Sequence, residues 1–400
     1  MVRRIFGILP TRLWYSDVEL PYEEFPVPER AMVLVAGDGV SLGSGDRVRS
    51  GERIHSVGGA VMGFSPVTGE IEECVEIRWS DGEVYTGLVV ATAADEWELP
   101  ITGGDFLAQS SAEVRSLLAE AGFTAPAAGA RVIVSCLERD LLVSTARQAL
   151  RGGDAAAGLQ LLEHLGVGEI VVAVPSDLAE AAADFAGDRV MVVRSYHPFG
   201  MAPLLERVCG AGTVLGIEEL LAMVRALRTG RPFCEKLVTL IDRGGRPVKN
   251  LRVRVGTPVS DIIRAHNILV EDGDRVVLGG PLCGRAVNRL DFPVLLDTDA
   301  VLVQGHDDII PIGEGSCLNC GACVRVCPYN LQVHLLSRYA EFSLFERCEE
   351  LDIDSCIECG LCAYVCRARR PLVQFIQFGK REVARIREEE AQEEEEEVTA

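Results

Sequence analysis

Two cysteine runs near the C-terminal end constrain this chain more than any other feature. "CLNCGACVRVC" spans residues 317–327 and "CIECGLCAYVC" spans 356–366, so each run has the spacing C-x2-C-x2-C-x3-C. Three thiolates at three-residue steps wrap a tight loop around one metal cluster, and Gly321 and Gly360 relieve the turn. The fourth cysteine of such a run points away from its own loop and ligates the other cluster.

The spacing therefore predicts two [4Fe–4S] clusters with crossed ligation. The expected ligands are Cys317, Cys320, Cys323 and Cys366 for one cluster, and Cys356, Cys359, Cys362 and Cys327 for the other. Structural zinc is the alternative, but a zinc site takes four thiolates in two pairs and has no use for a third CxxC step. The second run departs slightly from the ferredoxin pattern, because Arg367 stands where Pro328 follows the first run.

Six cysteines lie outside the runs: Cys74, Cys136, Cys209, Cys234, Cys283 and Cys348. All but Cys348 lie in or beside apolar stretches, where we expect them to fill the core. Cys348 lies between the runs and could replace a ligand, although its spacing fits neither motif. The six histidines show neither i, i+4 nor HExxH spacing, so we expect surface or packing roles for them.

Composition excludes some partners. The net charge of −21 argues against nucleic acid, whose phosphates need a basic face. Part of that charge is the run "EEEAQEEEEE", which we expect to be a solvated, frayed or disordered tail. No window reaches the ~18 apolar residues of a membrane span. The apolar piece in "MVRRIFGILPTRLWYSD" is too short for a secretory signal, so we expect a cytoplasmic protein, soluble or peripheral.

The remaining chain predicts several α/β and β modules. Glycine-punctuated apolar runs from 31 to about 90 are typical of a small β-barrel or sandwich. Strand-like runs at 131–138, 169–175 and 189–196 alternate with helical patterns, which predicts a parallel sheet. Strand patterns return between 231 and 305 and suggest a β-grasp-like module. The glycine-rich stretches "GAGTVLG" (210–216), "ITGGD" (101–105) and "GGPLCG" (279–284) are expected to be plain turns.

With this order of modules, the chain resembles the RnfC family, the peripheral NADH-dehydrogenase-like subunits of Rnf electron transport complexes, from about Ala31 to Arg385. The match is most specific from "GRPFCEKLVTLIDRGGRPVKNLRVRVGTPVSDII" through "LGGPLCGRAV" and both cysteine runs to "RRPLVQFIQFGKREVAR". The resemblance implies partner redox subunits, among them Rnf-type membrane subunits, a soluble electron donor or acceptor, and a place on the cytoplasmic face of the inner membrane.

The resemblance also implies a domain order, here given with the flanking segments: 1–30 an N-terminal arm, 31–98 a biotinyl/lipoyl-like hybrid barrel without the carrier lysine, 99–230 a Rossmann-like NADH/FMN-binding α/β domain, 231–305 an SLBB β-grasp domain, 306–385 a 4Fe-4S dicluster domain, and 386–400 an acidic tail. Gly212 and Thr213 match a family position that lines the flavin pocket.

One stretch departs from the family. RnfC-like proteins carry a glycine-rich loop of the form GLGGAGFPT before the first α/β strand and a GAECEP-like stretch after it. This chain reads "LLAEAGFTAPAAGARVIVSCLERD", with only "AGFT" kept from the loop. Backbone amides approach a phosphate only where glycines clear the way, so the loss argues against FMN and NADH.

Three functions follow. The leading hypothesis is an electron relay whose two clusters connect a soluble donor with a partner or membrane redox complex. The alternative is an FMN-containing NADH:acceptor oxidoreductase subunit. A third is an assembly protein with purely structural clusters. No catalytic residue is singled out in any of them.

Overall fold

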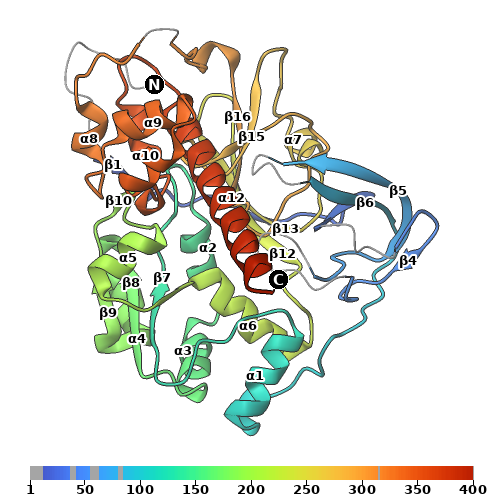
Figure 1. The fold of residues 1–400 in the computed structure, drawn as a ribbon. Coiled ribbons are helices and arrows are strands. Elements are labelled where there is room, and N and C mark those ends of the chain that lie inside the picture. Colours follow the sequence, from blue (N-terminus) through green and yellow to red (C-terminus); the bar gives the residue numbers. More distant parts are fainter. Residues whose placement is uncertain (1–11, 37–41, 55–62, 80–83, 314–315, 400) are drawn as a thin grey trace. The chain divides into compact units, whose positions relative to one another are not determined.

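The computed structural model describes residues 12–36, 42–54, 63–79, 84–313 and 316–399, with side chains to residue 393 (Figure 1). The chain forms two compact units; one is Trp14–His306 and the other contains everything from Asp307 onward. Among the described residues, no helix has both the length and the apolar character needed to cross a bilayer.

The first module of the larger unit is a four-stranded antiparallel sheet with the order β3-β6-β5-β4. Its strands are β3 (Arg30–Ala36), β4 (Arg47–Val48), β5 (Gly69–Arg78) and β6 (Val84–Thr92). Strand β3 is buried on both faces, because Val33 packs into this module's own core while Leu34 packs against a neighbouring sheet. Burial on both faces explains the unbroken apolar run of β3 in the sequence.

The second module is a parallel sheet of four strands in the order β11-β7-β8-β9. Its strands are β7 (Arg131–Ser135), β8 (Glu169–Val174), β9 (Val190–Val192) and β11 (Thr213–Gly216). The three predicted strand regions are confirmed. Strand β11 was missed, since the glycines of "GAGTVLG" were interpreted as a turn.

Helices cover both faces of this parallel sheet, as buried parallel strands require. They are α1 (Ser111–Glu120), α2 (Thr145–Gly152), α3 (Ala155–His164), α4 (Ala179–Ala186), α5 (Ala202–Cys209) and α6 (Ile217–Thr229). Val132 and Val134 of β7 pack into the core that holds α3 and α6. Ile133 points to the other face, where it packs with Leu205 of α5.

The third module is a six-stranded mixed sheet with the order β15-β14-β16-β12-β13-β2. Its elements are β12 (Glu235–Ile241), β13 (Pro247–Arg254), α7 (Val259–Ala265), β14 (Arg275–Leu278), β15 (Arg285–Val287), β16 (Ala300–Gln304) and the distant β2 (Tyr22–Glu24). The first and last strands of 231–305, β12 and β16, lie parallel at the centre, and β12 pairs with β13 as an antiparallel hairpin.

The N-terminal arm adds the sixth strand to this sheet. Strand β2 follows the short β1 (Leu13–Trp14) and pairs in parallel with β13, Tyr22 opposite Asn250. The phenol of Tyr22 also accepts a hydrogen bond from Arg252 Nε at 2.8 Å. The segment is extended, as the sequence predicts. Its pairing with β13 was not predicted, because no local sequence pattern connects strands so far apart in the chain.

The C-terminal unit consists of short helices packed on one long one. The helices are α8 (Ala322–Val326), α9 (Val333–Glu341), α10 (Phe345–Glu350), α11 (Leu361–Tyr364) and α12 (Leu372–Thr399). Leu336 of α9 and Ile376 of α12 are fully buried in the shared core. A Cβ on Gly379 would lie 3.0 Å from the Cβ of Ala340, so the glycine permits the close approach of α12 to α9.

The expectation of a frayed or disordered acidic tail is wrong for the backbone. Helix α12 continues through the glutamate run to Thr399, although residues 387–393 are exposed, so the run is solvated as expected. Extending a helix that packing has already nucleated is favourable for Glu, Gln and Ala. Arg387 also pairs with Asp354 at 2.9 Å, which fixes α12 at the start of the acidic stretch.

The α/β core can be tested with two leucines. Leu161 of α3 is fully buried, so Leu161→Ala should lower the free energy of unfolding by about 2–5 kcal/mol through lost contacts and a cavity. Leu269 is 62% exposed, and Leu269→Ala should change it by no more than about 0.5 kcal/mol. Urea denaturation followed by circular dichroism measures both. Equal effects of the two substitutions would contradict the assigned core.

Candidate functional site

Both cysteine runs fold into the same loop. The residue before the second cysteine has a positive φ in each, 50° at Asn319 and 56° at Glu358. The glycine after that cysteine follows at 67° for Gly321 and 75° for Gly360, which confirms the predicted role of the glycines in the turn. Left-handed backbone at a glutamate is uncommon, and nothing in the residue type at 358 would have predicted it.

The fourth cysteines leave the two loops in the same way. Cys327 follows helix α8 and Cys366 follows α11, and each is the start of a turn closed by a backbone hydrogen bond of 3.1 Å, from Asn330 N–H and Arg369 N–H respectively. Those two donors have φ of 54° and 53°. The replacement of proline after the second run therefore leaves the backbone path unchanged.

The thiol groups of the two runs lie among one another. Burial raises the pKa of the Cys323 thiol, and the nearby Cys317 and Cys366 thiolates raise it further. Cys323 and Cys317 belong to the first run, whereas Cys366 ends the second. Cys320 of the same loop is exposed. The last cysteine of the second run thus lies beside the loop of the first.

The converse holds for the second loop. Burial raises the pKa of the Cys359 thiol to about 12, and the Cys356 and Cys327 thiolates add to the rise. The pKa of Cys362 is also raised, first by burial and then by neighbours that include Cys359, Cys356 and Cys323. Because the charge of Cys323 is among those that raise the pKa of Cys362, the two groups of thiols adjoin.

Hydrogen-bond donors and one cation lie beside the cysteines of both loops. The N–H of Asn319 donates to Cys317 Sγ at 3.4 Å. In the second loop, burial raises the pKa of Cys356, while the Glu358 N–H and the Lys380 ammonium lower it. Lys380 of α12 donates to the Cys356 carbonyl at 2.7 Å and pairs with Glu358 at 3.1 Å, so the long helix holds this loop in place.

The cysteines outside the runs divide by burial. Cys348 is fully buried and its Sγ donates to the Leu336 carbonyl at 3.8 Å, which makes it a core residue. Cys136, Cys209 and Cys234 are buried as expected. Cys74 is exposed on β5, so the core-filling prediction is wrong for it; β5 alternates between faces, and position 74 falls on the outer one.

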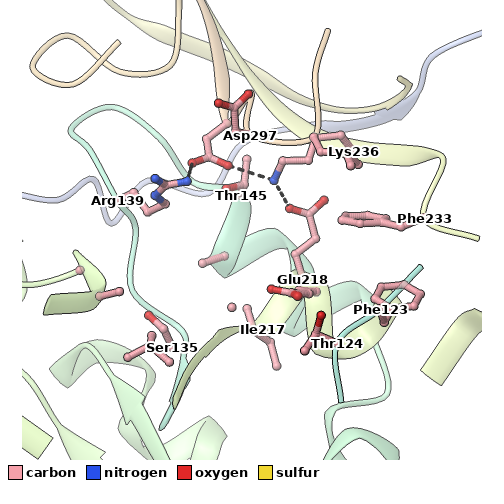
Figure 2. A pocket seen from close by; sticks show the side chains of 18 of the residues that line it. Phe123, Thr124, Ser135, Arg139, Thr145, Ile217, Glu218, Phe233, Lys236 and Asp297 are labelled. Carbon is pink, nitrogen blue, oxygen red and sulfur yellow. Dashed lines mark hydrogen bonds and ion pairs between the residues drawn. The ribbon is translucent and has the colours of Figure 1, made fainter. Parts of the chain in front are cut away.

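A cavity of about 930 Å³ lies at the α/β module, and side chains of the first and third modules complete its lining (Figure 2). Its lining includes Ser135 at the end of β7 with Glu138 in the loop beyond, and Gly216 at the end of β11 with Glu218 in the first turn of α6. Strands β8 and β9 lie on one side of β7, and β11 lies on its other side. The cavity therefore lies where the strand order reverses. Open α/β sheets bind their ligands at this switch point, outside the carboxyl ends of the strands.

The charged side chains of the cavity are mostly acidic, and two of its cations pair with carboxylates. Five carboxylates face three cations: Glu138, Glu218, Glu219, Asp297 and Asp299 against Arg53, Arg139 and Lys236. Lys236 Nζ pairs with Glu218, as Figure 2 shows, and with Asp299 at 2.9 Å. Burial lowers the pKa of Lys236, but these two carboxylates outweigh it and the net pKa is raised. Arg139 lies 3.7 Å from Asp299.

This lining does not fit the phosphate groups of FMN or NADH. The remnant "AGFT" (121–124) lines the cavity, but its Gly122 packs on the ring of Phe64, which a Cβ would approach to 2.7 Å. Arg53, a third candidate cation, donates to the Glu120 carbonyl at 2.7 Å. A phosphate here would face five acidic side chains, and two of the three cations already pair with Glu218 or Asp299.

Gly212 and Thr213 lie at the opposite end of the strands. Thr213 pairs with Val132 at the start of β7, and a Cβ on Gly212 would lie 2.8 Å from the Arg131 carbonyl. Neither residue lines the cavity. Their predicted flavin contact stays a prediction, and this position gives it no support.

Known proteins match both parts of the chain. A family profile described as "4Fe-4S dicluster domain" matches residues 309–367. The C subunit of the proton-translocating ferredoxin:NAD(+) oxidoreductase complex of Clostridium ljungdahlii is 26% identical, over 94% of this chain and 93% of its own length. The C subunit of the ion-translocating oxidoreductase complex of Methanosarcina acetivorans is 35% identical over 42% of this chain.

Some of these relatives are longer than the matched region. The chain spans 38% of the Methanosarcina protein, and 58% of a 24% identical C subunit from Pectobacterium carotovorum that covers 96% of this chain. Over most of its length the chain is nevertheless similar to proteins that share this subunit name, and it contains a dicluster domain. The predicted RnfC-like character is confirmed.

The cavity carboxylate Glu138 predicts a pH dependence. Burial raises its pKa from 4.5 to about 7, although the N–H groups of Arg147 and Ala146 oppose the rise. Between pH 4.5 and about pH 7 the folded state binds this proton more tightly than the unfolded state does. The free energy of unfolding should therefore fall as pH rises through this range, by at most on the order of 3 kcal/mol. Urea denaturation at pH 5 and pH 7.5 measures this fall.

Glu138→Gln should flatten the dependence, because the amide does not titrate. Glu180→Gln, at an exposed position on α4, is the control and should keep the wild-type slope. An unchanged slope in Glu138→Gln would show that Glu138 does not titrate in this range.

Proposed function

We propose that this chain is the electron-transfer subunit of an Rnf-type ion-translocating oxidoreductase complex and relays electrons through two [4Fe–4S] clusters. The observation that carries the proposal is the crossing of thiols between two identical loops. Each cluster, when bound, accepts and releases one electron at a time.

The proposed ligand sets are those the spacing predicts: Cys317, Cys320, Cys323 and Cys366, and Cys356, Cys359, Cys362 and Cys327. Besides burial, the Cys317 and Cys366 charges raise the pKa of Cys323, which supports the first set. The Cys356 and Cys327 charges likewise add to the raised pKa of the buried Cys359, which supports the second. Zinc would leave the repeated third step of each run without a role. The closeness of Cys323 to Cys362 suits electron transfer between the two sites.

The domain assignments are part of this proposal. The parallel central strands β12 and β16 with helix α7 support an SLBB β-grasp domain at 231–305. The antiparallel sheet of β3 to β6 supports the hybrid barrel at 31–98, and the parallel sheet supports a Rossmann-like domain at 99–230. We assign 306–385 to the dicluster domain, with 1–30 as the arm and 386–400 as the acidic, helical end.

In this function the α/β and β-grasp modules act as a docking scaffold. Their partners would be a soluble electron donor or acceptor and other redox subunits, including membrane subunits of Rnf type. The chain would then bind at the cytoplasmic face of the inner membrane. The alternative is an FMN-containing NADH:acceptor oxidoreductase. The cavity at the carboxyl ends of the strands is where such cofactors would bind, but its carboxylates repel the phosphate groups of FMN and NADH.

Crossed ligation predicts which single substitutions behave alike. Cys327→Ala should remove the same cluster as Cys359→Ala, and Cys366→Ala the same one as Cys320→Ala, because each pair shares a cluster. Iron should fall from about eight to about four per chain in all variants. The EPR spectrum of the remaining cluster, recorded after dithionite reduction, should match within each pair.

Cys348→Ala is the control, since this buried thiol belongs to neither set, and it should keep both signals. If Cys327→Ala instead matched Cys320→Ala, each run would hold its own cluster and the crossing would be refuted.

The relay and its alternative differ in their flavin content. Anaerobically purified protein should contain about eight iron and eight sulfide per chain and release no flavin on heating. Dithionite should bleach the visible absorption of the clusters, whereas NADH should not, because the proposed relay uses no hydride-accepting flavin. Stoichiometric FMN together with NADH-dependent bleaching would instead establish the oxidoreductase.

A further inference from the structure

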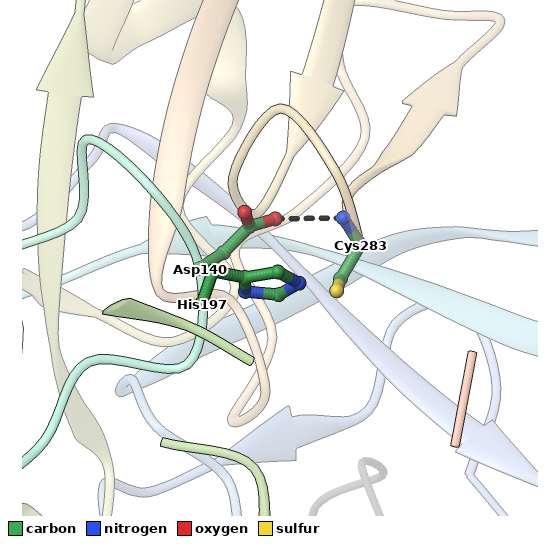
Figure 3. A group of neighbouring side chains, drawn as sticks. All are labelled: Asp140, His197 and Cys283. Atoms are coloured by element: carbon green, nitrogen blue, oxygen red, sulfur yellow. Dashed lines mark hydrogen bonds between the residues drawn. The ribbon is translucent and has the colours of Figure 1, made fainter. Parts of the chain in front are cut away.

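Three side chains of types that bind metal ions converge in the larger unit, away from both cysteine runs in sequence. They are Asp140 in the loop after β7, His197 in the short strand β10 (Tyr196–His197), and Cys283 between β14 and β15. Their carboxylate oxygen, imidazole nitrogen and sulfur all lie within 4.8 Å of one another (Figure 3). The residues come from three separate segments, so the convergence is a product of the fold.

The loop that carries Cys283 is built around Asp140. One carboxylate oxygen, Oδ2, accepts the N–H of Cys283 at 2.7 Å and that of Leu282 at 3.0 Å, as Figure 3 shows for the first. A Cβ on Gly280 would lie 2.4 Å from the Asp140 side chain, so only glycine lets the loop approach this closely. The stretch "GGPLCG", expected to be a plain turn, is therefore a cradle for a buried carboxylate.

Burial distinguishes this cluster from an ordinary surface group of acidic residues. Asp140 is 3% exposed and His197 is fully buried, while Cys283 is half-buried and leaves a side open to solvent. Tyr15 covers the imidazole, its ring edge-on to that of His197 at 6.4 Å. Backbone N–H groups, that of Leu141 on Oδ1 included, stabilise this buried carboxylate in part, and a cation bound with the imidazole and the thiol would neutralise it.

We propose that Asp140, His197 and Cys283 bind a divalent transition-metal ion of the Zn²⁺ type. Oxygen, nitrogen and sulfur ligands of this kind suit Zn²⁺, which accepts three protein ligands and keeps a fourth position for water. The N–H groups on Asp140 orient the carboxylate, as outer hydrogen bonds do for metal ligands. A single sulfur excludes an iron–sulfur cluster, so this site is independent of the eight cysteines in the runs.

Metal analysis of the full chain tests the site. Protein with both iron–sulfur clusters intact is incubated with excess Zn²⁺, desalted and analysed for zinc and iron by mass spectrometry. The wild type should retain about one zinc per chain, and Cys283→Ser and His197→Gln should retain less than about a fifth of that. Iron should stay at about eight per chain in all of them, because the clusters use other cysteines.

Cys74→Ser is the matched control, as it removes an exposed cysteine outside the cluster and should keep the zinc. Zn²⁺ should also raise the melting temperature of the wild type and of Cys74→Ser, but not of Cys283→Ser. The proposal would be overturned if the wild type retained no zinc, or if wild type and Cys283→Ser retained equal amounts of zinc per chain. Iron content reports separately on the clusters, so failure of this site leaves the electron-relay function to its own tests.

Discussion

The arrangement of the C-terminal unit depends on how many sulfurs one tight loop can direct at one metal cluster. A C-x2-C-x2-C loop supplies three, and the next cysteine is carried away by the helix that follows. In the proposed ligand sets each run completes the other, so the two loops must be held at a fixed spacing. The buried contact of α9 with α12 provides it, through Leu336 and Ile376. Lys380 then connects the same α12 to the second loop.

The larger unit has a cavity where α/β proteins bind nucleotides, but the lining of this cavity is mostly acidic. The cavity lies at the switch point of the parallel sheet, where nucleotides bind in many α/β proteins. Here Lys236 is occupied by Glu218 and Asp299, and the glycines that would bring backbone amides to a phosphate are missing. A cavity of this shape and charge suits a neutral or cationic group better than an anion.

Local pattern explains most of what the sequence predicted correctly. Cysteine spacing determines the loops, and β-branched runs determined β7, β8 and β9 because both faces of a parallel sheet are buried. Pattern failed where the partner is distant or the segment is short. Strand β11 is short and follows glycines, and Cys74 depends on which face of β5 points outward. The Asp140 cluster was missed because nothing in the spacing of Asp140, His197 and Cys283 connects them.

The edge pairing of β2 with β13 has a consequence for the order of folding. Tyr22 and the Arg252 that bonds to it are 230 positions apart, so at about 5–20 residues per second the ribosome needs roughly 10–50 s to deliver the partner of the arm. During that time a strand with unpaired N–H and C=O groups is available to other chains. Proline has no N–H to donate to a neighbouring strand. Pro21, Pro26 and Pro28 therefore limit the wrong pairings that the arm can form before β13 is synthesised.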